Sequence, residues 1–548
     1  MIEAAARGHG AAMHFPNLAR AAALVLCLGA GCGSPDSVDS ATPSNAGGSG
    51  AAAGSGAQPD AGAGARAGSA GAGGNGGQDA SDPPPNTGGT GATNTGGTGA
   101  TNTGGTGATS TGGTGAADAG GGATDAGSTG GTNTGGTGAQ PDCTPSDWKS
   151  SGKVANPTVQ AVAADAGTTH QLYGASKGIA AYDYLEEESF ISGTSPAYTS
   201  RIVVHRPKNA GRFTGTVFME WYNVTGGIDI APLWALSREY MMRAGHVHVG
   251  VSAQAVGANA LKTYDAERYA AINHPGDTAA NAIFAQAAMA IRSQTEKLLG
   301  RCMPVRAVIA LGQSQSSALL GTYLTSAHPQ DQIYDGFMLH SSPFGGPPSG
   351  NPDVPVFVIY TMNEANGSVV SQPNLVEWEV AGATHNDAHL MARGEEEQGA
   401  TTNIRIECSA TVNDFPAFWV YNAALDWLEG WVRTGKKPPS GPPLQSATDT
   451  YGNRTGGVRS PHIDVPIATY TNANAAKNPL DLLSSFACGL SGSVVPFTSE
   501  RLLGLYPTHD DYVKKYTQAA DKALGAGYLL RADYETAIQK AKAAPIPK

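Results

Sequence analysis

The chain has 548 residues and a formal net charge of −11, and its Lys and Arg residues form no cluster. A nucleic-acid-binding function is therefore not favoured, because it needs a basic patch. The length allows one large globular domain or two smaller ones.

An apolar segment of about ten residues follows Arg20, within "AAALVLCLGAGCG" (21–33). A membrane-spanning helix needs about 20 apolar residues, so this pattern is typical of an export signal instead. "LGAGC" resembles the lipobox of bacterial lipoproteins, which predicts an export signal over residues 1–32 and a lipid on Cys32. Gly29 stands where a lipobox has a large apolar residue, so simple secretion is an alternative, and an N-terminus without a targeting role is another.

Residues 33–141 consist mainly of Gly, Ala, Thr, Ser and Asn, and "NTGGTGAT" repeats from Asn86, Asn94 and Asn102. Such a segment buries too few apolar side chains to offset the entropy of ordering. We predict a disordered linker with an r.m.s. span on the order of 55 Å, which would tether a globular domain over 142–548. A low-complexity expansion without a selected role is the alternative.

Apolar runs rich in β-branched and aromatic residues predict strands at 201–206, 215–223, 246–252, 305–312, 334–342, 354–362 and 375–382. Helical patterns lie between or after these runs, at 232–245, 277–300, 316–327 and 415–435. The alternation predicts an α/β fold with a mostly parallel sheet and right-handed crossovers. The short connection 207–214 between the first two strands predicts that the sheet starts with antiparallel pairing. Asp277 is the expected N-cap of the helix that it begins.

The pattern weakens after the proline-rich stretch "KKPPSGPP" (436–443). Residues 437–498 receive no assignment, and about 498–548 predict a helical appendage packed on the domain. Four cysteines follow the linker, at Cys143, Cys302, Cys408 and Cys488. In an exported chain they allow two disulfides in any of three pairings, and their spacing does not match a zinc site.

Three serines lie in "ALGQSQSSALL" (310–320), between a predicted strand and a predicted helix. A serine nucleophile on a sharp strand-to-helix turn needs small residues two places before and after it, because strand and helix approach closely there. Ser314 has Gly312 and Ser316 in those places. Ser316 itself would lie further into the helix, and Ser317 has a bulky glutamine two places before it. Ser314 is therefore the candidate nucleophile.

A histidine follows the last predicted strand, in "VEWEVAGATHNDAH". A base at that place can reach a nucleophile across the carboxyl edge of a parallel sheet. His385 is therefore the candidate base, with His389 as its competitor. A satisfied structural histidine is the alternative role.

The acid that orients the base must lie between the serine and the histidine in chain order. Glu364 lies on the loop after the predicted strand 354–362 and can fix the tautomer of the base. Asp353 precedes that strand at the opposite edge, and Asp387 follows His385 too closely to orient it. Glu364 is the candidate acid, and a solvated loop residue is the alternative role.

The stretch "MEWYNVTGG" (219–227) carries a strand into a glycine-containing loop. Backbone N–H groups of such a loop, and of the residue after the nucleophile, form the usual oxyanion hole of such a site. Gln315, Asn223 and Val224 are the candidate donors, and an ordinary Gly-Gly turn is the alternative.

Two long stretches at the carboxyl edge, 252–277 and 340–353, are predicted to be irregular insertions around a substrate pocket. Tyr264, Tyr269 and Trp221 are the candidate lining residues. Neither stretch specifies the substrate.

The motifs E-W-x-N-V-T-G-G, V-S-A-Q (251–254), H-P-G-D (274–277), G-Q-S-Q-S and A-G-A-T-H occur together in this chain. In this combination, from about residue 150 to the C-terminus, the chain resembles a bacterial branch of the α/β-hydrolase superfamily known as "alpha/beta hydrolase domain" proteins, which have no settled substrate. G-x-S-Q-S is the usual elbow in that branch. The resemblance implies an α/β-hydrolase fold, and it implies ester hydrolysis by analogy, because this fold hosts many reactions.

The residues and the resemblance together predict a serine hydrolase, most simply a carboxylic ester hydrolase, built on Ser314, His385 and Glu364. No metal or cofactor is required. The expected partner is a small or polymeric ester, and membrane contact is expected through the lipid on Cys32 alone. A surface-anchored binding or structural protein on an inactive hydrolase fold is one alternative, and an amidase or peptidase is another.

Overall fold

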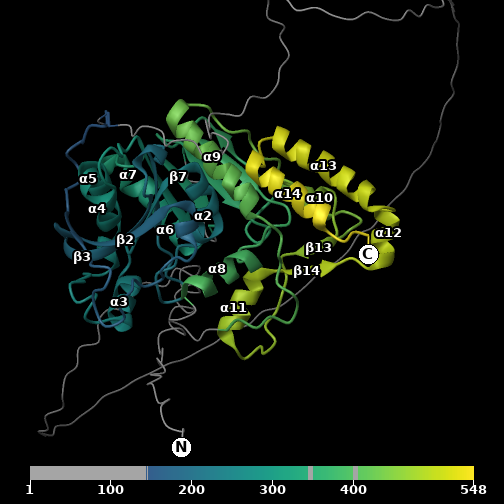
Figure 1. Cartoon of the computed structure of the whole chain (residues 1–548), viewed down its shortest axis with the longest axis horizontal. Helices are drawn as coiled ribbons and strands as arrows, with labels where there is room; N and C mark the ends of the chain where they lie inside the picture. Colours follow the sequence, from purple (N-terminus) through teal and green to yellow (C-terminus); the bar gives the residue numbers. More distant parts are fainter. Residues whose placement is uncertain (1–142, 145, 343–349, 399–404, 548) are drawn as a thin grey trace, which may run out of the picture. The chain divides into compact units, whose positions relative to one another are not determined.

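The computed structural model describes residues 143–144, 146–342, 350–398 and 405–547 (Figure 1). The predicted export signal, its lipidation site Cys32 and the predicted linker over 33–141 lie outside these residues. Within the described part of the chain, no helix has both the length and the apolar character needed to span a membrane.

A ten-stranded sheet forms the centre of the fold, in the order β1-β2-β3-β5-β4-β6-β7-β8-β10-β9. Its strands are β1 Thr158–Ala161, β2 Tyr184–Thr194, β3 Ala197–Pro207, β4 Thr216–Trp221, β5 Val247–Val251, β6 Ala307–Gln313, β7 Gly336–His340, β8 Val356–Tyr360, β9 Ser371–Gln372 and β10 Leu375–Glu379. Neighbouring strands are parallel from β5 to β10, while β1, β2, β3 and β5 pair antiparallel and β9 pairs antiparallel with β10. The predicted mostly parallel sheet is confirmed.

The antiparallel start differs in detail from the prediction, because β3 pairs with β2 and β5 rather than with β4. The short connection after β3 therefore joins strands that are not neighbours. The sequence pattern missed β2, whose "YLEEESFISGT" places three consecutive glutamates inside the strand and so breaks the apolar run. All three glutamates gain ion-pair partners on β3, which the pattern of one strand does not reveal.

Helices cover both faces of the sheet, and alternate strand residues point to the two layers. Val217, Met219 and Trp221 of β4 pack with one core that includes α4 and α6, while Phe218 packs with a second core that includes α2 and α9. The helices between and after the strands are α2 Pro232–Ala244, α3 Ala255–Tyr264, α4 Ala280–Ser293, α5 Thr295–Leu298, α6 Gln315–Ser326, α7 His328–Asp331, α8 Ala388–Gln398 and α9 Phe418–Thr434.

The stretch 252–277 is more regular than predicted, because it contains α3. Its polar cap also differs from the prediction: Asp277 accepts a hydrogen bond from the N–H of Ala255, at 2.7 Å, and so caps α3. The helix that follows Asp277 has no side-chain cap of its own. A carboxylate near two helix starts satisfies whichever orphan N–H the fold brings to it.

The C-terminal part completes the domain with short hairpins and helices, seen in yellow-green and yellow in Figure 1. Its elements are β11 Leu444–Thr448, β12 Arg454–Gly456, α10 Pro461–Asp464, β13 Ala468–Thr471, α11 Leu482–Ser491, β14 Ser493–Pro496, α12 Ser499–Leu505, α13 His509–Gly525 and α14 Arg531–Ala543. The last three helices share an apolar core that includes Trp419 of α9, so the helical appendage does pack on the domain. Disulfides join Cys143 to Cys302 and Cys408 to Cys488.

Candidate active site

A sharp turn joins β6 to α6 at Ser314, whose backbone has φ +58° and ψ −122°. A non-glycine residue rarely adopts this conformation, and it marks backbone strain held by the surrounding structure. The turn is tight: a Cβ on Gly312 would lie 2.9 Å from the carbonyl oxygen of Ser316. A side chain at position 312 would therefore push the strand and the helix apart, as the sequence argument requires.

Ser316 occupies the place where the usual motif has a second glycine. Its hydroxyl accepts a hydrogen bond from the N–H of Gln313 and donates one to the carbonyl of Gln313, at 3.1 and 3.0 Å. Ser317 is fully buried within α6. Of the three serines, Ser314 alone stands on the turn, and Ser316 ties the start of α6 to the end of β6.

Ser314, His385 and Glu364 form one chain of short contacts. Ser314 Oγ lies 2.8 Å from His385 Nε2, and His385 Nδ1 lies 2.5 Å from Glu364 Oε1. The residues come from the carboxyl ends of β6, β10 and β8, which meet at one edge of the parallel sheet. The structure therefore brings together all three residues that the sequence singled out.

The surroundings of Glu364 favour its carboxylate form, which can accept a hydrogen bond from His385. Burial works against its charge, but hydrogen bonds with His385 and from Thr361 outweigh burial and lower its pKa below the ordinary value. The Thr361 hydroxyl donates to Glu364 Oε2 at 2.6 Å. This second bond leaves Oε1 directed at the histidine.

Two residues that the sequence analysis did not single out hold the histidine loop. The N–H of His385 donates to Asn363 Oδ1 at 3.1 Å, and Gln313 Nε2 donates to the carbonyl of His385 at 3.4 Å. Asn363 directly precedes Glu364, and Gln313 directly precedes Ser314. Their places next to two candidate site residues could have identified them in the sequence.

The competing residues have other partners. His389 stacks on Phe418 at 4.3 Å between ring centres. Asp387 accepts a hydrogen bond from the N–H of Leu390 and so caps α8, and burial raises its pKa to about 7. Asp353 lies 3.7 Å from His328. None of these contacts involves the Ser314–His385 pair.

Of the predicted oxyanion donors, the N–H groups of Gln315 and Val224 remain candidates, whereas that of Asn223 serves a backbone carbonyl. Gln315 is the first residue of α6, where a backbone N–H has no intrahelical acceptor. The N–H of Val224 lies in the 222–231 loop after β4 and faces the side chain of Gln315. The N–H of Asn223 donates to the carbonyl of Ile230 at 2.9 Å, because the two residues form a bridge that closes this loop.

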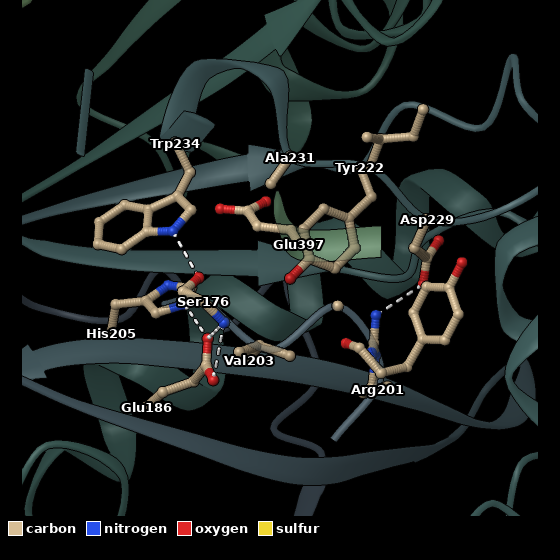
Figure 2. Close-up of a pocket in the computed structure, with 13 residues that line it drawn as sticks. Ser176, Glu186, Arg201, Val203, His205, Tyr222, Asp229, Ala231, Trp234 and Glu397 are labelled. Carbon is tan, nitrogen blue, oxygen red and sulfur yellow. Dashed lines mark hydrogen bonds and ion pairs between the residues drawn. The ribbon is translucent and has the colours of Figure 1, made fainter. Parts of the chain in front are cut away.

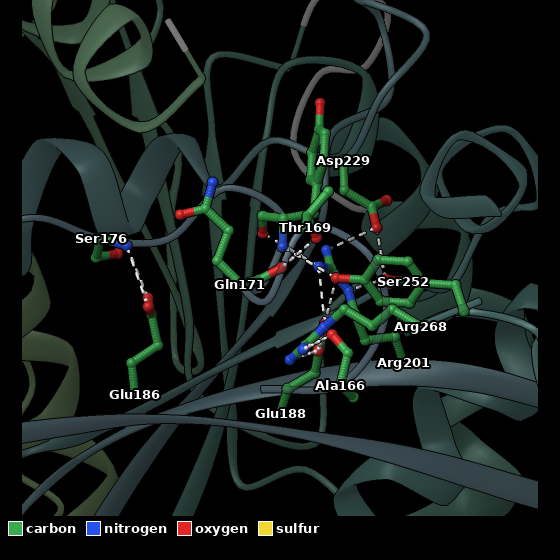
Figure 3. A network of polar contacts seen from close by, with 12 residues as sticks. Ala166, Thr169, Gln171, Ser176, Glu186, Glu188, Arg201, Asp229, Ser252 and Arg268 are labelled. Atoms are coloured by element: carbon green, nitrogen blue, oxygen red, sulfur yellow. Dashed lines mark hydrogen bonds and ion pairs between the residues drawn. The ribbon is translucent and has the colours of Figure 1, made fainter. Parts of the chain in front are cut away.

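Asn223 supports the site through its side chain instead. Its Nδ2 donates to the carbonyl of Gln313 at 2.9 Å, which ties the 222–231 loop to the elbow. At the other end of the loop, Asp229 accepts from Arg201 at 3.1 Å and from the Ser252 hydroxyl at 2.5 Å (Figure 3). The loop is thus anchored to β3, to the end of β5 and to the elbow.

Two of the three predicted pocket residues, Trp221 and Tyr269, lie in the core. Tyr269 is fully buried, and its hydroxyl donates to Glu188 at 2.9 Å within the ion network of Arg201 and Arg268 shown in Figure 3. Trp221 is buried in the sheet core, and Tyr264 is half-buried against the ring of Tyr173. Trp221 and Tyr269 therefore fill the core, while Tyr264 is only partly buried and stays a candidate lining residue.

A small cavity lies beside the 222–231 loop (Figure 2). Tyr222 and Asp229 of this loop line it, together with Glu186, His205 and Glu397. The cavity is large enough for one water molecule. Tyr264, Tyr269 and Trp221 do not line it.

Next to this cavity, four titratable side chains form what we call the interior Glu–His chain: Glu186, His205, His248 and Glu220. They stand on the adjacent strands β2, β3, β5 and β4, with successive contacts of 2.8, 3.0 and 2.9 Å. Both imidazole rings stack against Trp234. Glu220 also accepts from the N–H groups of Leu233 and Trp234 at the start of α2, directly behind the 222–231 loop.

Burial raises the pKa of Glu220 to about 8, although the two helix N–H groups oppose the change. Burial also lowers the pKa of His248, and the nearby His205 adds to that effect. Both shifts favour the uncharged forms of these groups. No group of three or more His, Cys, Asp or Glu side chains within the described ranges is arranged to hold a metal ion.

Comparison with known proteins places the chain in a family. The family model described as "Alpha/beta hydrolase domain" matches residues 154–539, which confirms the resemblance and the fold class. No curated protein matched the sequence.

Among solved structures, a prolyl endopeptidase is 12% identical, with 33% of this chain and 30% of that chain covered and a TM-score of 0.23. Esterase Est22 is 12% identical, with 35% of this chain and 68% of that chain covered and a TM-score of 0.26. Oligopeptidase B from Leishmania major is 10% identical, with 34% of this chain and 29% of that chain covered and a TM-score of 0.24. The chain thus spans less than a third of either peptidase.

Proposed function

Because the chain belongs to the alpha/beta hydrolase domain family, we propose that it is a serine hydrolase that cleaves carboxylic esters through an acyl-enzyme. The observation that carries this proposal is the unbroken chain from Ser314 Oγ through His385 to Glu364, which begins on a strained turn. A nucleophile, a base and an orienting acid in this relation are the general requirement for acyl transfer by serine.

In the proposed reaction, Ser314 Oγ attacks the acyl carbon while its proton passes to His385 Nε2. Collapse of the tetrahedral intermediate breaks the bond to the alcohol, which takes that proton from His385. A water molecule then gives a proton to His385 and attacks the acyl-serine. The bond between the acyl carbon and Ser314 Oγ breaks, Oγ takes the proton from His385, and the carboxylic acid is released. Glu364 keeps the proton of His385 on Nδ1 and stabilises the imidazolium in both halves.

The negative charge on the acyl oxygen needs donors that are in place before the reaction. The N–H groups of Gln315 and Val224 are the proposed pair. The anchoring of the 222–231 loop through Asn223 and Asp229 supports this role, because it fixes the loop relative to the elbow. Loss of a single such donor typically lowers kcat by about 10²- to 10³-fold.

The test is labelling of the full chain with a small fluorophosphonate, followed by peptide mapping. We expect a single phosphonylated residue, Ser314, and a fall in ester hydrolysis on the order of 10⁶-fold for Ser314→Ala. Ser317→Ala is the matched control, because Ser317 lies buried in the same helix and is expected to leave labelling unchanged. Full activity in Ser314→Ala would refute Ser314 as the nucleophile. Absence of label on Ser314 together with absence of ester hydrolysis would refute the proposal and favour a binding protein on an inactive fold.

The choice of an ester over an amide rests on chemistry, because an alcohol leaves a tetrahedral intermediate more readily than an amine does. We expect a larger kcat/KM for p-nitrophenyl acetate than for p-nitroacetanilide, measured on the same preparation. The reverse order would replace the esterase assignment with an amidase and leave the triad intact.

We also propose that the protein is exported and anchored by a lipid on Cys32. The two disulfides support an oxidising compartment, since such bonds are rare in the cytosol of mesophiles. Metabolic labelling with a radioactive fatty acid should mark the wild-type chain and not Cys32→Ala. Unlabelled wild-type chain found free in the medium would favour simple secretion.

A further inference from the structure

The side chain of Gln315 connects three loops at the carboxyl edge of the sheet. Its Oε1 accepts a hydrogen bond from the N–H of Val224 at 3.3 Å, and its Nε2 donates to Gln254 Oε1 at 2.9 Å. The same oxygen of Gln254 accepts from the indole of Trp221 at 3.3 Å. The amide of Gln315 is therefore held at both ends, by the loop after β4 and by the loop after β5.

This arrangement conflicts with an open oxyanion hole. A substrate oxygen bound there must accept from the N–H of Val224 and from the N–H of Gln315. In the structure, the first of these donors already serves the carbonyl oxygen of the Gln315 side chain. Because the donor is a single N–H group, the amide oxygen and an acyl oxygen compete for it.

We propose that the Gln315 side chain closes the oxyanion hole of the free enzyme, so that a substrate carbonyl enters only when this side chain turns away from Val224. The inference rests on the proposed function. Gln254 is the residue that holds the closed position, because it binds the far end of the amide and is itself almost fully buried. Trp221 in turn fixes Gln254, which gives this buried indole N–H a partner.

Two substitutions separate the contribution of the Gln315 side chain from that of Gln254, which holds it. Gln315→Met keeps the length of the side chain but removes both hydrogen bonds, so the N–H of Val224 loses its acceptor. Gln254→Leu leaves the Gln315 amide present but free at its far end, so we expect a smaller effect. Gln330→Met is the matched control, because Gln330 is exposed on α7, away from these loops.

The first readout is hydrogen exchange at the Val224 amide in the full chain, resolved by fragmentation of the peptide that contains it. We expect exchange to be about two- to tenfold faster in Gln315→Met than in wild type, as one lost hydrogen bond implies, and intermediate in Gln254→Leu. This readout requires no activity, so it tests the closed contact even if Ser314 resists every reagent.

The second readout is the second-order rate constant for phosphonylation of Ser314. Because the phosphonyl oxygen enters the same hole, we expect Gln315→Met to react about two- to tenfold faster than wild type. Unchanged exchange at Val224 in Gln315→Met would overturn the proposal. Faster exchange with slower phosphonylation would overturn it too, because the side chain would then assist oxyanion binding. If wild-type Ser314 is not phosphonylated at all and no ester is hydrolysed, the proposed function is refuted instead. Hydrogen exchange at the Val224 amide then tests the contact between Gln315 and Val224 by itself.

Discussion

Two carboxylate–histidine arrangements in this molecule have similar geometry and different surroundings. In the candidate active site, His385 Nδ1 lies 2.5 Å from Glu364 Oε1. In the interior Glu–His chain, His205 lies 2.8 Å from Glu186 and His248 lies 2.9 Å from Glu220. A short contact between an imidazole and a carboxylate is thus not sufficient to identify a catalytic base.

The difference lies in what the second nitrogen of each ring meets. The Nε2 of His385 meets Ser314 Oγ on a backbone held at φ +58°, whereas the Nδ1 atoms of His205 and His248 meet each other at 3.0 Å. The pKa directions differ as well: burial dominates at Glu220 and raises its pKa to about 8, while hydrogen bonds outweigh burial at Glu364 and lower its pKa. The first carboxyl faces the candidate base, and the second lies among buried groups behind the 222–231 loop.

The largest expected effect breaks the catalytic arrangement. Glu364→Gln can donate to His385 Nδ1 and so favours the wrong tautomer, which should lower kcat for ester hydrolysis by about 10⁴-fold. Steady-state rates with p-nitrophenyl acetate measure this loss. Asp387→Asn is the matched control on the same loop, because Asp387 caps α8, and it should keep kcat within a few-fold. Equal losses in both variants would contradict the assignment of Glu364.

The interior chain should respond in stability instead. Glu220→Ala leaves the N–H groups of Leu233 and Trp234 and one nitrogen of His248 without their partner, so we expect the free energy of unfolding to fall by about 3 kcal/mol. Glu220→Gln can still accept from Leu233 and donate to His248, and should lose about 1 kcal/mol. Urea denaturation measures both values. An unchanged free energy of unfolding in Glu220→Ala would mean that Glu220 does not fix the start of α2.

The same carboxyl predicts a pH dependence with a definite sign. Its pKa is about 8 in the folded chain and about 4.3 when unfolded, so between these values the folded state binds a proton that the unfolded state has released. The free energy of unfolding therefore falls as pH rises from about 5 to 8, by at most about 1.4 kcal/mol per pH unit for this group. Burial raises the pKa of Glu397 to about 8 and that of Asp387 to about 7, so these carboxyls contribute with the same sign.

Glu220→Gln should remove the contribution of Glu220, and Glu397→Gln should remove that of Glu397. Urea denaturation at several pH values between 5 and 8 gives the slopes. Each variant should show a flatter dependence than wild type. If Glu220→Gln kept the wild-type slope, Glu220 would be charged in the folded protein.

The candidate triad could be predicted because its residues follow from chain order and local sterics. Gly312 leaves space at the turn, and Ser314, Glu364 and His385 each follow a strand of the parallel sheet at its carboxyl edge. Parallel strands bring such positions together whatever the rest of the chain does. The assignment therefore needed the strands and their order, without any detail of side-chain packing.

The hydrogen-bonded surroundings could not be predicted, because they depend on which strands become neighbours. The pairing of β3 with β5 places His205 beside His248, and no periodicity within either strand encodes this. In the same way, the bridge between Asn223 and Ile230 engages the N–H of Asn223, which the loop pattern had predicted to be an oxyanion donor. Long-range pairing decides both outcomes.

The smallest expected effect concerns the residue that made the elbow unusual. Ser316→Gly restores the common motif but removes two hydrogen bonds with Gln313 and adds backbone freedom in the first turn of α6, so the free energy of unfolding should fall by about 1 kcal/mol. Phosphonylation of Ser314 should continue within about threefold of the wild-type rate, because the Ser316 hydroxyl faces the backbone of β6. Ser316→Ala separates the two effects, since it removes the hydrogen bonds without the added freedom. Loss of labelling in Ser316→Ala would place this hydroxyl in the chemistry, whereas loss of stability alone would leave it as the tie between strand and helix.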